Sequence, residues 1–135
     1  MSEVLTSTKL ESVEKIAKNL VAVCRKGDFS EAVRKYYADD VVSIESMAME
    51  GQSREVRGIE AVMKKKQMWN ENTEVHKMDV SEPLVAGSYF TVRYILDATC
   101  KQTNQRMTME EIGVYKVENG KIVREEFLYD CGDCG

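Results

Sequence analysis

The sequence MTMEEIGVYKVENGKIVREEFLYD, residues 107–130, decides the fold class of this chain. It contains two runs in which apolar and polar side chains alternate, as they do along a β-strand with two different faces. Between the runs stands Glu118-Asn119-Gly120, which fits a three-residue hairpin loop whose third residue takes a positive φ. The stretch therefore predicts an antiparallel hairpin at the end of the chain.

Outside this hairpin, the second half of the chain also consists of strand-like segments. Two of them precede the hairpin, at about 74–84 and 88–100. Gln102-Thr103-Asn104 offers another three-residue loop between the second of these segments and the hairpin. We therefore expect an antiparallel meander of strands.

The first half of the chain is predicted to form three helices. Apolar residues recur at spacings of three and four from Leu10 to Cys24, and Asp28 with Glu31 forms a capping box for a short second helix. A third helix is expected from Gly58 to about Asn70, with a short strand at 41–45 before it. The triple lysine 64–66 lies on this helix, as a solvated face or as a contact for an anion.

Helices followed by strands indicate an α+β domain, with three N-terminal helices packed on one face of a curved antiparallel sheet. The length of 135 residues is that of a single domain, which we place at 1–130. We expect residues 131–135 to be a flexible tail containing Cys131 and Cys134, with a redox or metal role or a cross-chain disulfide as the alternatives.

Composition excludes several classes of function. A net charge of −4 disfavours a nucleic-acid surface, and no apolar run approaches the roughly 20 residues that span a bilayer. No Gly-rich phosphate loop is present, and the possible metal ligands Cys24, Cys100 and His76 are scattered. We therefore expect a cytoplasmic protein without nucleic-acid or membrane partners, without a metal and without a cofactor.

The two hairpin loops predict which side chains share a face of the sheet. Three-residue loops pair Asp97 with Met109 and Glu111 with Phe127. One face then mixes charges with apolar groups, which is typical of a ligand pocket. Its candidate ligand-contacting members are Arg93, Asp97, Met109, Glu111, Glu125, Phe127 and Tyr129. The alternative is a buried paired set without a ligand, such as Arg93 with Glu111 or Glu125.

The opposite face carries an apolar row that the helices cannot also cover. The row consists of Val92, Tyr94, Leu96, Ile112, Val114 and Leu128. Such a row, left exposed, is larger than monomers normally tolerate, so we expect a homodimer formed through the sheet.

Three segments resemble the nuclear transport factor 2-like superfamily. They are GDFSEAVRKYYADDVVSIES (27–46), GIEAVMKK (58–65) and the final hairpin (107–130). Within the superfamily, the SnoaL-like branch is the most similar. The resemblance implies a cone-shaped α+β fold with a pocket between sheet and helices, frequent homodimers, and members that include isomerases, dehydratases, polyketide cyclases and non-catalytic binding domains.

The resemblance to ketosteroid isomerase, within this superfamily, places the general-base carboxylate on Glu45. The two oxyanion donors of that enzyme fall on Leu20, which lines the expected pocket, and on Gly113, so both donors are missing. Steroid isomerisation by that mechanism is not expected, because oxyanion stabilisation is usually the largest catalytic contribution.

Two further residues complete the candidate site. His76 shares strand parity with Met78 and would point inward as a proton carrier, with a hydrogen-bonded structural histidine as the alternative. Trp69 ends the third helix at the expected pocket rim.

The sequence predicts a pocket for a small, apolar, oxygenated molecule. As a cofactor-free cyclase, isomerase or dehydratase, the protein would use Glu45 as the base, with His76 or Arg93 polarising an oxygen. The resemblance to SnoaL-type polyketide cyclases implies an acidic base in an apolar pocket, a role for which Glu111 and Glu125 are alternatives to Glu45. The alternatives are a non-catalytic ligand-binding domain and a dimeric interaction domain of the same fold.

Overall fold

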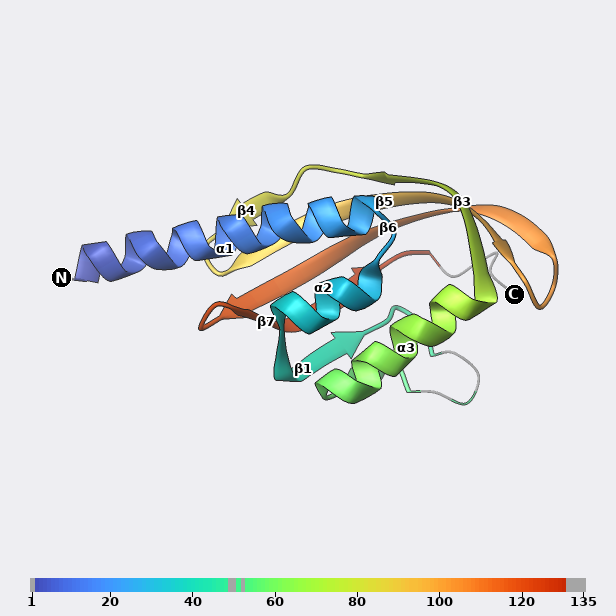
Figure 1. The fold of residues 1–135 in the computed structure, drawn as a ribbon, viewed down its shortest axis with the longest axis horizontal. Helices are drawn as coiled ribbons and strands as arrows, with labels where there is room; N and C mark the ends of the chain where they lie inside the picture. Colours follow the sequence, from blue (N-terminus) through green and yellow to red (C-terminus); the bar gives the residue numbers. More distant parts are fainter. Residues whose placement is uncertain (1, 49–50, 52, 131–135) are drawn as a thin grey trace.

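The structure, a computed structural model, describes the backbone of residues 2–48, 51 and 53–130, and the side chains within that range from residue 13 onward. Within these residues, three helices and seven strands follow one another (Figure 1). Their bounds are α1 Ser2–Arg25, α2 Phe29–Tyr36, β1 Tyr37–Ile44, β2 Glu55–Arg57, α3 Ile59–Asn72, β3 Thr73–Val80, β4 Leu84–Ala86, β5 Tyr89–Cys100, β6 Gln105–Glu118 and β7 Lys121–Leu128. Among these residues, no helix is long and apolar enough to cross a membrane.

The strands form one curved, open sheet in the order β2-β1-β7-β6-β5-β3, with β4 paired to β5. All pairs are antiparallel except β1 with β7, so the sheet is mixed rather than wholly antiparallel. The predicted α+β class, three helices on a curved sheet, is confirmed. β1 begins directly after α2 at Tyr37, four residues before the expected strand.

The helices divide the concave face of the sheet between them. α1 packs against β3 and β5, whereas α3 packs against β1 and β2 (Figure 1). The carboxylate of Asp28 caps α2 by accepting a hydrogen bond from the amide of Glu31 at 3.0 Å, as the sequence predicts. The apolar stripe of α1 and the inward side chains of β5, β6 and β7 form the core.

The register between β5 and β6 differs from the prediction by one residue. Leu96, not Asp97, pairs with Met109, because the connecting turn holds residues 101–104 and bends at Asn104, whose φ is +55°. Since side chains alternate between faces, the slip turns every β5 side chain over. It buries the apolar Val92 and Leu96 against the helices, which decides the register.

The β6–β7 hairpin differs as well, but keeps its predicted inner face. Its loop has two residues, Asn119 and Gly120, both at positive φ, and a bulge follows in β7. Together the two changes shift the pairing by two, so Tyr115 lies opposite Glu125. A shift of two leaves each side chain on its own face.

The predicted apolar row is therefore divided between the two faces. Val92, Tyr94 and Leu96 lie in the core, and their assignment to the outer face was wrong. Ile112 and Leu128 do lie on the outer face, where they are 44% and 46% exposed.

Candidate functional site

Five charged side chains gather between α3 and the sheet, and we call them the interior cluster. They are Glu45, Lys65, Lys66, Glu111 and Glu125. Glu45 follows β1, both lysines come from α3, and the other two carboxylates come from β6 and β7. The cluster occupies the place where the sequence predicts a ligand pocket.

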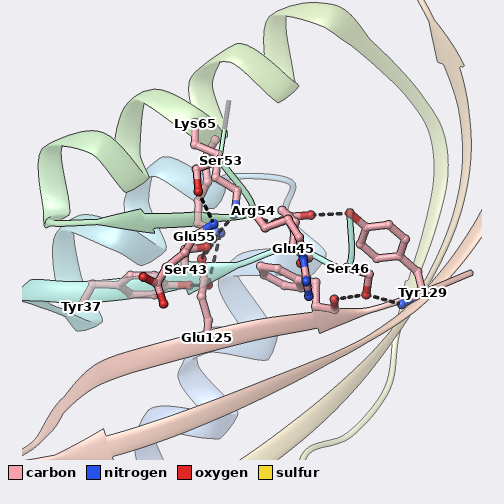
Figure 2. Close-up of polar contacts among 12 residues, drawn as sticks. Tyr37, Ser43, Glu45, Ser46, Ser53, Arg54, Glu55, Lys65, Glu125 and Tyr129 are labelled. Atoms are coloured by element: carbon pink, nitrogen blue, oxygen red, sulfur yellow. Dashed lines mark hydrogen bonds and ion pairs between the residues drawn. The ribbon is translucent and has the colours of Figure 1, made fainter. Parts of the chain in front are cut away.

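Glu125 is the deepest member of the cluster and is fully buried. The Ser43 hydroxyl donates to its Oε2 at 2.6 Å and the Tyr37 hydroxyl donates to its Oε1 (Figure 2). Lys66 Nζ lies 3.0 Å from Oε2. Burial alone would raise the pKa of Glu125, but the Lys66 charge and the two hydroxyl donors lower it below its ordinary value. Glu125 is therefore a fixed anion. The β7 bulge turns it inward, three residues after the equally buried Ile122.

Glu45 and Lys65 form a second ion pair nearer the solvent. Lys65 Nζ lies 2.5 Å from Glu45 Oε2 and donates to the Ser43 hydroxyl at 2.7 Å (Figure 2). The Tyr129 hydroxyl donates to the other carboxylate oxygen of Glu45 at 2.9 Å. Burial and the charge of Glu45 raise the pKa of Tyr129, so this phenol stays protonated. Both oxygens of Glu45 are thus occupied by donors.

Backbone contacts hold the residues of this second pair in place. The Ser46 hydroxyl donates to the carbonyl of Phe127 at 2.7 Å and accepts from the amide of Tyr129 at 3.1 Å (Figure 2). The amide of Glu45 donates to the carbonyl of Arg54 at 2.9 Å. The ends of β1 and β7 are therefore tied together where Glu45 and Tyr129 meet.

The two lysines also lie over aromatic rings. Phe127 has Lys65 Nζ at 5.6 Å and Lys66 Nζ at 5.1 Å from its centroid, and Lys66 lies 5.6 Å from that of Tyr37. These distances suit cation–π attraction. Only 15% and 14% of the Lys65 and Lys66 side chains is exposed, so the solvated face predicted for the lysines is wrong at these two positions.

The sequence held a signal for the inward lysines. Val62 is fully buried and Trp69 is half-buried on the same helix. Lys65 and Lys66 follow Val62 by three and four residues and precede Trp69 by the same spacings, so they lie on the apolar stripe of α3.

Glu111 differs from the other carboxylates of the cluster. Within the described residues it has no hydrogen-bond or ion-pair partner, although it pairs across the sheet with Tyr94 and faces the cluster. Burial and the negative charge of Glu45 raise the pKa of Glu111 to about 7, against the opposing charge of Lys66. A carboxyl that gains and loses its proton near neutral pH is suited to general acid–base work.

Most of the other predicted ligand-contacting residues lie on the inner side of the sheet. Phe127 and Tyr129 contact the cluster, while Met109 and Trp69 are half-buried against the core, Trp69 with its ring 5.9 Å from that of Phe29. Leu20 is 1% exposed and belongs to the core.

His76, Arg93 and Asp97 were expected in the pocket, and the structure places them elsewhere. His76 is the extra residue of a bulge in β3, and its Nε2 lies 2.7 Å from Thr99 Oγ1 on an exposed surface. The one-residue slip of β5 turns Arg93 and Asp97 to the outer face. There Arg93 pairs with Glu110, and Asp97 with Arg106 at 2.8 Å.

Tyrosine hydroxyls extend the polar groups into the core. The hydroxyls of Tyr94 and Tyr115 lie 2.6 Å apart, and Cys24 Sγ lies 3.8 Å from that of Tyr94. Burial raises the pKa of the Cys24 thiol to about 11, so it is not a reactive thiolate. The ring of Tyr115 covers Gly113, one of the two positions where the oxyanion donors are missing.

Features that would point to another kind of site lie away from the cluster. One surface hollow lies on α1, around Lys15, and another on α3, around Asn70, and no cluster residue lines either. Within the described part of the chain, no three His, Cys, Asp or Glu side chains are grouped as metal ligands. The tail with Cys131 and Cys134 lies outside the described residues.

A family model for the SnoaL-like domain matches residues 11–129, so the chain belongs to the SnoaL-like family. A Mesorhizobium loti protein, provisionally described as a SnoaL-like polyketide cyclase, is 45% identical to the chain. The match covers 85% of this chain and 97% of that one, with a TM-score of 0.79. Comparison with curated proteins finds no match.

More distant structures share the fold. A nuclear transport factor 2-like protein from Burkholderia xenovorans is 19% identical, with a TM-score of 0.74, and the match covers 90% of this chain and 91% of that one. A provisionally assigned isomerase from Bacillus subtilis is 16% identical, with a TM-score of 0.70 and coverages of 90% and 88%. The cone-like architecture expected from the sequence resemblance is thus the fold of this chain.

Proposed function

We propose that this protein is a cofactor-free acid–base enzyme of the cyclase, isomerase or dehydratase type, acting on a small, apolar, oxygenated molecule. The observation that carries the proposal is one partly buried carboxyl, Glu111, which faces two ion pairs but belongs to neither. The provisional description of the 45% identical Mesorhizobium loti protein as a SnoaL-like polyketide cyclase supports this class of chemistry.

In this mechanism Glu111 removes a proton from the carbon next to a substrate carbonyl. Negative charge then develops on the carbonyl oxygen, where the Lys65 ammonium stabilises it with the hydrogen that it directs neither at Glu45 nor at Ser43. Glu111 returns its proton to a different carbon or oxygen, which completes an isomerisation, an aldol cyclisation or a loss of water. Glu45 positions Lys65 rather than acting as the base, because its two oxygens already accept from Lys65 and from the Tyr129 hydroxyl.

The charge of the cluster favours a neutral substrate. Lys65 is neutralised by Glu45, and Lys66 by Glu125. No cation among the described cluster residues is left for a substrate carboxylate or phosphate, and an ionised Glu111 would repel one.

The test is proton exchange, which requires no knowledge of the product. Neutral 1,3-diketones and enones are incubated with the protein in D₂O, and NMR follows loss of the α-proton. The rate of catalysed exchange should be at least about 100-fold lower in the Glu111→Gln variant than in wild type. Glu110→Gln is the matched control, since Glu110 is the exposed neighbour on the outer face. Equal rates in Glu111→Gln and wild type would refute the assignment of the base.

A non-catalytic binding domain of the same fold is the second candidate.

The outer face of the sheet favours a homodimer for either function. Ile112 and Leu128 are a cross-strand pair, both exposed, and they lie between the charged pairs Arg93–Glu110 and Arg124–Glu126. A second copy related by a two-fold axis would cover this apolar centre and bring charges of both signs to the rim.

A further inference from the structure

We propose that Glu125 is a positioning residue. By pairing with the Lys66 ammonium in the deepest part of the cluster, it prevents Lys66 from forming an ion pair with the Glu111 carboxyl. This inference rests on the proposed function, because it concerns the residue that we assign as the base. It goes further by giving a task to the one carboxylate that a substrate cannot reach.

Glu125 has no capacity for other chemistry. It is fully buried, and Tyr37, Ser43 and Lys66 all direct hydrogens at its two oxygens. Removing such a group from water is costly unless every lone pair finds a donor, and here the donors are present. Glu125 is thus a counter-ion rather than a proton carrier.

The Ser43 hydroxyl links Glu125 to Lys65. It has one hydrogen, which it donates to Glu125 at 2.6 Å, so it accepts from Lys65 at 2.7 Å. Through Ser43, the charge of Glu125 therefore also orients Lys65 toward Glu45. One buried carboxylate fixes both lysines.

The pairing of Lys66 with Glu125 changes the electrostatic environment of Glu111. The charged and titratable groups that face it come from every neighbouring element: Glu45 after β1, Lys65 and Lys66 on α3, Tyr94 on β5, Glu125 on β7 and Tyr129 beyond β7. Lys66 is the strongest of the groups that favour the ionised form of Glu111. While Lys66 is paired with Glu125, at 3.0 Å, its attraction for Glu111 is largely offset.

The experiment follows the titration of Glu111 by NMR of ¹³C-carboxyl-labelled glutamate, with the signal assigned from the Glu111→Gln variant. Glu125→Gln should lower the midpoint by about one pH unit, because a repelling anion is lost and Lys66 is released. Lys66→Met should raise it by about as much. The double variant, which loses both charges, should return to within about 0.3 pH units of wild type.

Opposite shifts distinguish positioning from a structural role, which would change stability without moving the midpoint in both directions. Glu126→Gln, the outward neighbour, is the matched control and should have no effect. Unchanged midpoints in folded single variants overturn the proposal. If Glu125→Gln does not fold, Glu125→Asp takes its place: the shorter side chain keeps the charge but withdraws it from Lys66, so the midpoint should still fall, and an unchanged midpoint there overturns the proposal equally.

The titration and the exchange assay fail independently. Titration needs no substrate, so shifted midpoints without any proton exchange would keep the role of Glu125 and refute the enzyme. Catalysed proton exchange with unshifted Glu111 midpoints would keep the enzyme and refute the role of Glu125.

Discussion

The ring of Tyr115 lies back over Gly113, two residues earlier on the same strand. A Cβ on residue 113 would stand 2.8 Å from Cε2 of Tyr115 and 2.9 Å from its hydroxyl oxygen. The Phe90 ring stacks on that of Tyr115 with 4.7 Å between their centroids, and the Phe127 ring stands nearly perpendicular to it at a centroid distance of 6.2 Å. Tyr115 is 2% exposed, so it has no room in which to move away.

Gly113→Ala should therefore lower the free energy of unfolding by roughly 1–3 kcal/mol, through overpacking of the Tyr115 ring. Urea denaturation measures the change. Thr108→Ala, on an exposed position of the same strand, is the control and should change stability by less than about 0.5 kcal/mol. Equal stability of Gly113→Ala and wild type would show that Tyr115 leaves its place over residue 113 without cost.

Much of the fold could be predicted because it depends on short-range patterns. The helices of the first half follow from apolar spacing and from the Asp28 cap, which the structure contains. The inward direction of Glu111 and Phe127 follows from alternation along one hairpin, where a shift of two residues changes no face. These features needed no knowledge of the rest of the chain.

The remainder depended on choices that local sequence does not fix. A loop of three or four residues is compatible with the sequence around Gln102–Asn104, and a difference of one residue moved Arg93 and Asp97 to the outer face. The bulge at His76 likewise had no local marker. Burial of the alternate β5 side chains Val92, Tyr94 and Leu96 decided the register and removed Arg93 and Asp97 from the site.

Replacing His76 tests the corrected assignment. Because its ring contacts Thr99 on an exposed surface, His76→Ala should leave any catalysed proton exchange within about twofold of wild type and change stability by less than about 0.5 kcal/mol. Exchange rates and urea denaturation are the measurements. A loss of exchange comparable to that of Glu111→Gln would return His76 to the site.

The outer face gives a prediction about assembly. Ile112→Glu should convert a dimer into a folded monomer, because it places like charges at the centre of a two-fold contact. Sedimentation measures the change, with circular dichroism as the check on folding. Met68→Glu is the matched control: Met68 is 38% exposed on α3, which packs against the opposite face of the sheet, and its replacement should leave the dimer intact. A monomeric wild type would exclude the dimer.

Glu111 gives a prediction about pH and stability. Its pKa is raised from the ordinary value of 4.5 to about 7 by burial and by Glu45, so the folded protein holds this proton more tightly than the unfolded chain does. The resulting stability is fully present below pH 4.5 and is lost as the pH rises through 7. Glu111→Gln has no such proton to lose. It should therefore match wild type at low pH and exceed it at pH 8 by up to about 3 kcal/mol.

Urea denaturation at intervals from pH 4 to pH 8 measures this difference, and comparison with Glu111→Gln removes the contributions of all other titrating groups. Glu110→Gln provides the comparison variant, because Glu110 is exposed on the outer face, outside the interior cluster. Glu45→Gln should narrow the pH range over which this stability is lost, because removing the Glu45 charge lowers the pKa of Glu111 in the folded protein. If the difference between Glu111→Gln and wild type is the same at every pH, the Glu111 carboxyl titrates alike in the folded and unfolded states, and burial in the cluster does not raise its proton affinity.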